Sequence, residues 1–316
     1  MSSSLIVRLA TIDLGTNTVR LLVADATAGA RTWRAVDQDQ RVTRLGEGLR
    51  QTGRLSDAAA ARTTATVVEY VERARRAGAT RIDIVATSAV REAANGAAYA
   101  AGLERACATP VRVISGEEEA RLTLRGILDG VGIGQGTTLA FDIGGGSTEF
   151  MLARGGTLAA AVSLRLGVVG LAERYPFPGP VEAGLYHALE TEVAQQLARE
   201  LPASIVEPPV DRLVGSAGTV TTLAALDLGL AAYDATRVQG HTLTRAAIEA
   251  QRARLASLDV RGRAALPCLE PGRADLILPG VAIVTATMAR LRCERLVVSD
   301  WGLREGILAD LLTGAI

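Results

Sequence analysis

Residues 141–150 read FDIGGGSTEF, and residues 12–18 read IDLGTNT. Each stretch is an apolar strand that ends in an aspartate and continues through a glycine-containing turn with hydroxyl side chains into a second strand. The same plan at two places in one chain predicts two half-molecules of like architecture. We expect the two turns to face one another across a cleft.

Predicted strands and helices alternate around these two turns, which indicates an α/β fold. The first half has predicted strands at residues 5–13, 19–25, 33–43, 81–87 and 111–114, and predicted helices at 56–78 and 116–128. The second half has predicted strands at 137–142, 148–154, 157–165, 211–215 and 295–299. Its predicted helices lie at 181–200 and 218–228, from 245, from 273 with a kink at Pro279, and at 302–312. Residues 129–136 are the expected linker, so we expect domains at 1–128 and 129–301, with 302–316 as a candidate addition to the first.

Composition excludes several classes of protein. The chain has 316 residues, a formal net charge of +0 and 34 cationic residues, all of them arginine. Without lysine there is no Walker-type P-loop and no Schiff-base chemistry. The balanced charge and 3% aromatic residues argue against nucleic-acid binding, and no apolar stretch is long enough to span a membrane. The three cysteines form no C-x-x-C pair, which favours a reduced, cytoplasmic setting.

The two glycine turns are candidate phosphate sites. Successive backbone amides in such a turn supply partial positive charge, and glycine allows a phosphate to approach closely. The candidate residues are Gly15, Thr16 and Asn17 in the first turn, and Gly144, Gly145, Gly146 and Ser147 in the second. Closing a hairpin is the alternative role for either turn alone. Arg20, Arg91 and Arg273 lie near these loops or near VGSAGT (214–219), and are candidates for bidentate contacts with phosphate.

Carboxylates at the strand ends are candidate metal ligands. Asp13 and Asp142 end strands beside the turns, where they could hold a divalent cation through oxygen or water. Glu149 lies seven residues after Asp142, on the strand that leaves the same turn, and could return to the same ion. Residues 117–119 are three glutamates that open a helix; they could complement the helix dipole, or one could face the cleft, because successive positions point about 100° apart.

These motifs resemble the exopolyphosphatase/guanosine pentaphosphate phosphatase (Ppx/GppA) family. The resemblance covers IDLGTNTVRLLVAD, TRLGEG, TSAVREAANG, ISGEEEARL, FDIGGGSTEF, SLRLG, VGSAGTVTTLAAL, RADLILPG and VSDWGLREGIL, in the family's order over residues 5–312. It implies two ribonuclease-H-like domains of the actin, sugar kinase and heat-shock chaperone superfamily. It also implies hydrolysis of the terminal phosphoanhydride of polyphosphate, with guanosine pentaphosphate as the alternative substrate.

The resemblance assigns roles to individual residues. It implies that Glu119 is the catalytic acid/base, that Asp142 and Glu149 bind magnesium (or manganese in its place), and that Arg91 and the two turns bind phosphate. Two positions depart from the family's SLPLGAVRL: Arg165 replaces a proline and Gly170 an arginine. A homodimer is one option for the assembly.

Three rival functions stay open: a kinase of the same superfamily, a non-catalytic sensor of guanosine tetraphosphate, and an actin-like filament. The net charge of +0 and the end of the chain at Ile316 leave no place for a long cationic track, so we expect short polyphosphates to be preferred.

Overall fold

The computed structural model describes residues 6–27 and 32–314. Contacts divide the chain into two compact units. The first unit runs up to Gly126 and resumes at Leu303, and the second unit covers Ile127–Gly302.

The first unit is built on a five-stranded mixed sheet with strand order β3-β2-β1-β4-β5. Its strands are β1 (Ile6–Leu14), β2 (Thr18–Thr27), β3 (Trp33–Val42), β4 (Arg81–Ala86) and β5 (Val111–Val113). The strands β1, β2 and β3 form an antiparallel meander, whereas β4 and β5 run parallel to β1. The carboxyl ends of β1, β4 and β5 therefore share one edge of the sheet.

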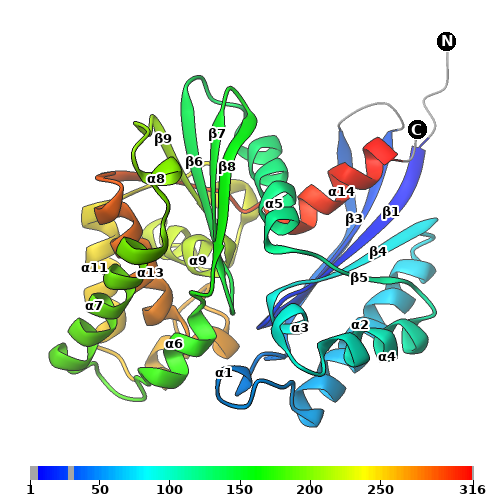
Figure 1. Ribbon diagram of the computed structural model, residues 1–316, viewed down its shortest axis with the longest axis horizontal. Helices are drawn as coiled ribbons and strands as arrows, with labels where there is room; N and C mark the ends of the chain where they lie inside the picture. Colours follow the sequence, from blue (N-terminus) through cyan, green and yellow to red (C-terminus); the bar gives the residue numbers. More distant parts are fainter. Residues whose placement is uncertain (1–5, 28–31, 315–316) are drawn as a thin grey trace. The chain divides into compact units, whose positions relative to one another are not determined.

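Helices cover both faces of this sheet (Figure 1). They are α1 (Leu49–Thr52), α2 (Asp57–Arg76), α3 (Ser88–Glu92), α4 (Gly96–Cys107), the first part of α5 (Gly116–Val131) and α14 (Leu303–Gly314). As predicted, α2 begins after Ser56, whose hydroxyl accepts a hydrogen bond from the amide of Ala59 at 3.2 Å. Its buried face packs on Ile12 and Ile84, and α14 packs on the opposite face of β1 and β2.

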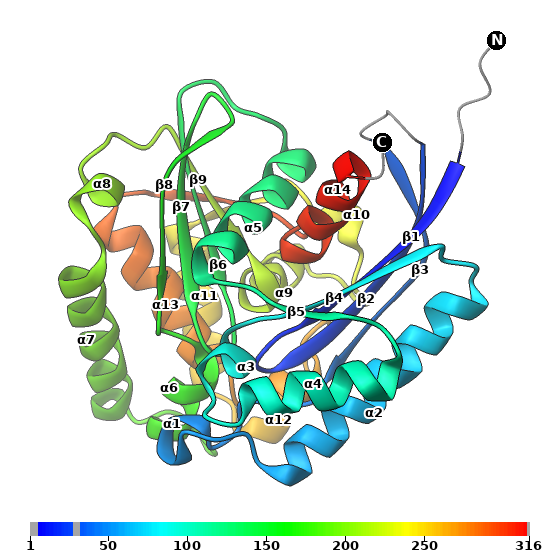
Figure 2. The same cartoon turned by 45° about the vertical axis from the view of Figure 1, so that its right-hand side comes forward.

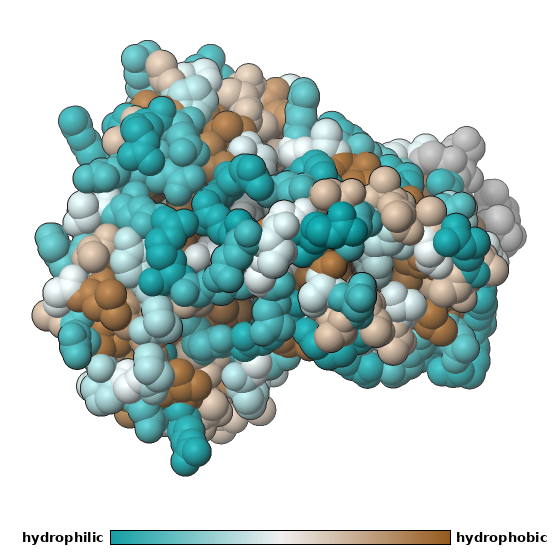
Figure 3. Space-filling model, turned by 60° about the horizontal axis from the view of Figure 1, so that its bottom comes forward, coloured by the Kyte–Doolittle hydropathy of each residue, from teal (hydrophilic) through white to brown (hydrophobic). Residues whose placement is uncertain are grey.

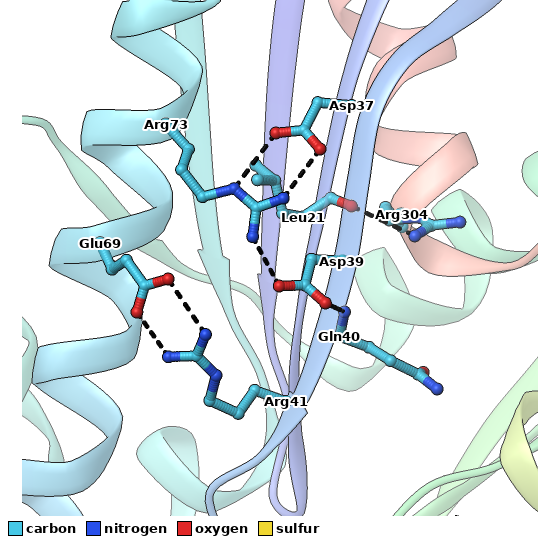
Figure 4. Close-up of polar contacts among 8 residues, drawn as sticks. All are labelled: Leu21, Asp37, Asp39, Gln40, Arg41, Glu69, Arg73 and Arg304. Atoms are coloured by element: carbon cyan, nitrogen blue, oxygen red, sulfur yellow. Dashed lines mark hydrogen bonds and ion pairs between the residues drawn. The ribbon is translucent and has the colours of Figure 1, made fainter.

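A ladder of ion pairs fixes α2 to the edge strand β3 (Figure 4). Arg73 donates to both oxygens of Asp37 at 2.8 and 3.2 Å, and to Asp39 at 2.6 Å. Arg41 donates to both oxygens of Glu69 at 2.5 and 3.0 Å. The aspartates raise the pKa of the Arg73 guanidinium, because they stabilise its charged form. The ladder holds the strand that is followed by residues 43–46, whose amides bind carbonyls of the turn between β1 and β2.

The second unit repeats the strand plan of the first. Its six-stranded sheet has the order β10-β11-β9-β6-β7-β8. The strands are β6 (Thr137–Ile143), β7 (Thr148–Arg154), β8 (Thr157–Leu164), β9 (Arg212–Ser216), β10 (Thr242–Thr244) and β11 (Arg295–Val298). Again three strands form an antiparallel meander, and two more, β9 and β11, continue parallel to its first strand.

Helices pack around the second sheet in both views of the ribbon (Figures 1 and 2). They are α6 (Val168–Arg174), α7 (Ala183–Glu200), α8 (Ala203–Val206), α9 (Ala217–Asp227), α10 (Ala235–Val238), α11 (Arg245–Ala256), α12 (Val260–Ala264), a short 3-10 turn (Pro271–Arg273) and α13 (Ile277–Arg290). Arg263 is fully buried and donates to the carbonyls of Phe177, Gly179, Leu258 and Ala274. It thereby ties α12 to the segment that follows Arg273.

Two sequence expectations differ from the structure. The expected linker 129–136 includes the end of α5, which continues to Val131. Gly130 is suited to this position, because a Cβ there would lie 2.7 Å from the Gln239 side chain and 3.0 Å from Trp301. The helix expected from residue 273 begins at Ile277. Pro279 therefore lies in the first helical turn, where a missing amide removes no intrahelical hydrogen bond.

The described surface is mixed in polarity. On the face shown in Figure 3, brown hydrophobic residues lie in separate patches among teal hydrophilic ones. Among the described residues, no helix has both the length and the apolar character needed to cross a bilayer.

Candidate functional site

The first glycine turn joins β1 to β2. The amide of Gly15 donates to the carbonyl of Thr18 at 3.1 Å, which closes the turn. A Cβ on residue 15 would lie 3.0 Å from that same carbonyl oxygen, so glycine suits the tight turn. Thr16 and Asn17 form the tip, and both are buried.

The second glycine turn joins β6 to β7 with the same geometry. The amide of Gly144 donates to the carbonyl of Ser147 at 2.9 Å, and a Cβ on residue 144 would again lie 3.0 Å from that oxygen. Gly145 and Gly146 occupy the tip. The predicted repeat is therefore present as two matching hairpins.

The two hairpins differ in charge at one register position. In the first unit Asp13 lies opposite Arg20, and their side chains approach to 4.0 Å. In the second unit Asp142 lies opposite Glu149. Directly opposed residues of an antiparallel pair have neighbouring side chains, so two carboxylates meet in the second unit where a carboxylate meets a cation in the first.

Serine hydroxyls hold the two carboxylates of the second unit. Ser216, at the end of β9, donates to Asp142 Oδ2 at 2.5 Å. Ser163, on β8, donates to Glu149 Oε1 at 2.7 Å, and Glu149 is only 2% exposed. A pair of hard oxygen ligands suits a divalent cation. No group of three or more metal-ligating side chains occurs in the described part of the chain.

Each glycine turn is covered by a short segment that follows the third strand of its meander. In the first unit, the amides of Thr43 and Arg44 donate to the carbonyl of Asn17 at 2.9 and 3.0 Å, and the amide of Gly46 donates to Thr16 at 2.8 Å. We call residues 43–46 and 165–169 the covering segments.

The covering segment of the second unit makes the same kind of contact. The amide of Val168 donates to the carbonyl of Gly144 at 3.2 Å, and that of Val169 donates to Gly145 at 2.9 Å. A Cβ on Gly167 would lie 2.3 Å from the carbonyl oxygen of Gly145, so only glycine allows this approach. The carbonyls of both turns are thus bound by protein.

Glu119 lies in the first turn of α5, beside Arg91 of α3. Arg91 Nη1 donates to Glu119 Oε2 at 2.9 Å and to the carbonyl of Ile114 at 2.9 Å. Glu119 is 7% exposed. These residues follow β4 and β5, at the edge of the sheet where the first glycine turn follows β1.

The other two glutamates of the cluster have different surroundings. Glu117 is exposed, and Glu118 pairs with Arg112 at 3.0 Å. The helical spacing therefore separates the three side chains as expected, and it buries only Glu119.

Arg273 lies close to the start of α9 in the second unit. A Cβ on Gly218 would lie 1.9 Å from Arg273 Nη1, so the guanidinium rests against the backbone there. Arg273 also pairs with Glu270 at 3.2 Å. Ala217 precedes Gly218 and has a positive φ of 71°. It follows Ser216, the residue that donates to Asp142. Arg273 is thereby placed beside the end of β9, where Ser216 reaches the acid pair.

Sequence reasoning missed the two serines and the covering segments. A signal for the covering segments exists: the tripeptide Arg-Leu-Gly occurs at residues 44–46 and again at 165–167, each time after the third strand of a meander. Ser216 and Ser163 carry no comparable signal, because cross-strand and long-range pairing brings them to the carboxylates.

The comparisons with known proteins agree with this architecture. The model of the Ppx/GppA phosphatase family matches residues 22–314. The chain is 34% identical to Exopolyphosphatase 2 of Mycobacterium tuberculosis over 319 residues, covering 96% of this chain and 98% of that protein. It is 28% identical to Exopolyphosphatase 1 of Mycobacterium bovis, covering 95% and 87% of the two chains.

Solved structures give the same result. A Ppx/GppA family member of Aquifex aeolicus matches with a TM-score of 0.83 and 30% identity, covering 98% of this chain and 99% of that one. An exopolyphosphatase of Cytophaga hutchinsonii matches with a TM-score of 0.89 and 25% identity, covering 97% and 98%.

Fold and site together define a two-domain α/β phosphoanhydride hydrolase of the ribonuclease-H-like type, with mixed sheets and glycine turns at the strand ends. The chain belongs to the Ppx/GppA phosphatase family.

Proposed function

We propose that this protein is an exopolyphosphatase, which hydrolyses the terminal phosphoanhydride bond of inorganic polyphosphate and releases orthophosphate. The observation that carries the proposal is Glu119, a buried carboxylate held by Arg91 at the same sheet edge as a glycine turn. Two relatives that match nearly the whole chain are named exopolyphosphatases, which supports the proposal.

Glu119 is the proposed general base. It accepts a proton from a water molecule whose oxygen attacks the terminal phosphorus, while the bond from that phosphorus to the bridging oxygen breaks. Arg91 keeps the carboxylate in place and, with Arg20, Arg273 and the turn amides, binds phosphate oxygens. We take the two units as the two domains of the proposed enzyme.

The acid pair of the second unit fits a divalent cation. Asp142 and Glu149 are opposed on neighbouring strands and each is oriented by a serine hydroxyl. We propose that they hold magnesium, with manganese as a substitute. When bound, the cation supplies positive charge to oxygens that gain negative charge in phosphoryl transfer.

We also propose an alternative substrate, an assembly and a cellular setting. Guanosine pentaphosphate is the alternative substrate, and a homodimer is the proposed assembly. The three free thiols Cys107, Cys268 and Cys293 support a reducing, cytoplasmic setting.

The direct test is phosphate release measured side by side on polyphosphates of several lengths and on guanosine pentaphosphate. We expect faster release from polyphosphate. Faster release from guanosine pentaphosphate would select the alternative. Transfer of phosphate from ATP to an added acceptor, or binding of guanosine tetraphosphate without release from any substrate, would contradict hydrolysis.

A further inference from the structure

We propose that the two covering segments, residues 43–46 and 165–169, are positioning elements that aim the amides of the glycine turns at phosphate. This inference rests on the proposed function, because it assigns the turns to phosphate binding. The residues of the covering segments contact the carbonyl side of the turns and need not contact the substrate.

The peptide groups of the second glycine turn have a fixed direction. In a trans peptide, the carbonyl and the following amide point in opposite directions. Because Val168 and Val169 bind the carbonyls of Gly144 and Gly145, the amides of Gly145 and Gly146 point away from the covering segment. In the described part of the chain, these two amides donate no hydrogen bond to the protein.

The peptide groups of the first glycine turn are held in the same way. Gly46 binds the carbonyl of Thr16, which turns the amide of Asn17 away from residues 43–46. Turn amides held in one direction form a concave group of donors that suits an anion. Since the carbonyls are already bound on one side, the turn cannot rotate its peptides without losing hydrogen bonds.

Each covering segment packs closely against its turn at a glycine. A Cβ on Gly46 would lie 2.2 Å from Thr16 Cγ2, and one on Gly167 would lie 2.4 Å from the carbonyl carbon of Gly146. Both glycines belong to an Arg-Leu-Gly tripeptide, although the chain between turn and tripeptide has a different length in each unit. The arrangement thus recurs with the turn itself.

Val168→Pro tests the inference, because it removes one covering hydrogen bond and places a ring carbon against the carbonyl oxygen of Gly144, while the backbone conformation at this position suits proline. Val168 is the first residue of α6, where proline is favoured. The preceding Gly167 has φ −127° and ψ 157°, which is the extended conformation required before proline. The matched control is Ala183→Pro, at the exposed first residue of α7, which also follows an extended residue.

We expect Val168→Pro to weaken orthophosphate binding, measured by titration calorimetry at fixed magnesium, by about 10- to 100-fold. The KM for tripolyphosphate should rise by a similar factor, whereas the magnesium concentration for half-maximal activity and the melting temperature should match those of the control. Orthophosphate affinity and KM equal to those of Ala183→Pro would overturn the inference.

A second pair of variants decides the matter if Val168→Pro does not fold. Gly167→Ala pushes the covering segment off the turn, whereas Gly184→Ala adds a Cβ with no atom within 4 Å. We expect weaker orthophosphate binding in Gly167→Ala only, and equal binding would overturn the inference. Absence of phosphate release by the unmodified protein would defeat the proposed function instead, and the orthophosphate titration would still report on positioning.

Discussion

At the scale of single residues, Glu119 and Glu117 lie two positions apart on α5 but only Glu119 is buried and held by an arginine. We expect Glu119→Gln to lower kcat by about 10² to 10⁴, because the amide cannot accept the proton of the attacking water. KM should change little. Initial rates of phosphate release measure both, with Glu117→Gln as the matched control. Similar mild losses in the two variants would remove Glu119 from its proposed role.

A second prediction concerns the acid pair. Asp142→Asn and Glu149→Gln should each raise the magnesium concentration needed for half-maximal activity, because each removes one hard oxygen charge. Glu182→Gln, at an exposed residue before α7, should leave that concentration unchanged. Magnesium titrations of activity compare the three variants. Full activity of the unmodified protein after exhaustive chelation would contradict the metal site.

At the scale of elements, the ladder between β3 and α2 predicts a difference between two nearby arginines. Arg73 makes three hydrogen bonds to Asp37 and Asp39, and its side chain is 26% exposed. Arg76 makes one exposed contact with Glu72 at 3.6 Å. We expect Arg73→Met to lower the free energy of unfolding by about 1–3 kcal/mol, because two aspartates lose a charged donor.

Arg76→Met is the control on the same helix, and it should cost no more than about 0.5 kcal/mol. Urea denaturation followed by circular dichroism measures both variants. Equal losses would mean that the ladder does not fix α2 to the sheet. The Tyr70 ring between Arg41 and Arg73 packs in the same place, and burial raises the pKa of its hydroxyl.

The hairpins and most helices could be predicted from the sequence, because alternation, turn residues and caps are local signals. The strand–glycine–strand pattern at residues 141–150 and the cap at Ser56 are examples that the structure contains. The course of α5 through Gly130 could not be predicted, since it depends on the packing of Gln239 and Trp301.

Long-range pairing explains what sequence reasoning missed in the site. Ser216 reaches Asp142 because β9 pairs with β6, which residue spacing along the chain does not reveal. The sequence predicts that Arg91 binds phosphate. Its hydrogen bond to Glu119 forms because β4 pairs with β5, which brings together the residues that follow the two strands. The metal and phosphate roles of the named residues stay predictions.

At the scale of the whole molecule, charge predicts the substrate length. The chain has a net charge of +0 and no lysine, and many of its arginines pair with carboxylates. Salt-dependent affinity for a polyanion grows with the number of phosphates bound. We therefore expect a preference for short polyphosphates and a shallow dependence of KM on salt.

Gel analysis of products from a long polyphosphate checks this expectation. Release after few cycles should shorten all chains together. Complete degradation of some chains while others stay intact would show processive action and contradict the prediction. A relative of strongly basic charge, assayed beside it, is the useful comparison.

The matching hairpins also bear on the ancestry of the chain. Two meanders with the same strand order, the same turn closure and the same Arg-Leu-Gly tripeptide are what a gene duplication leaves behind. The copies have since diverged in charge at one paired position, which holds Arg20 in one and Glu149 in the other. Under the proposed function, the arginine in one copy binds an anion and the glutamate in the other binds a cation. Arg20→Glu would place two opposed carboxylates in the first hairpin as well, although Gln40 lies opposite residue 20 where Ser163 lies opposite Glu149.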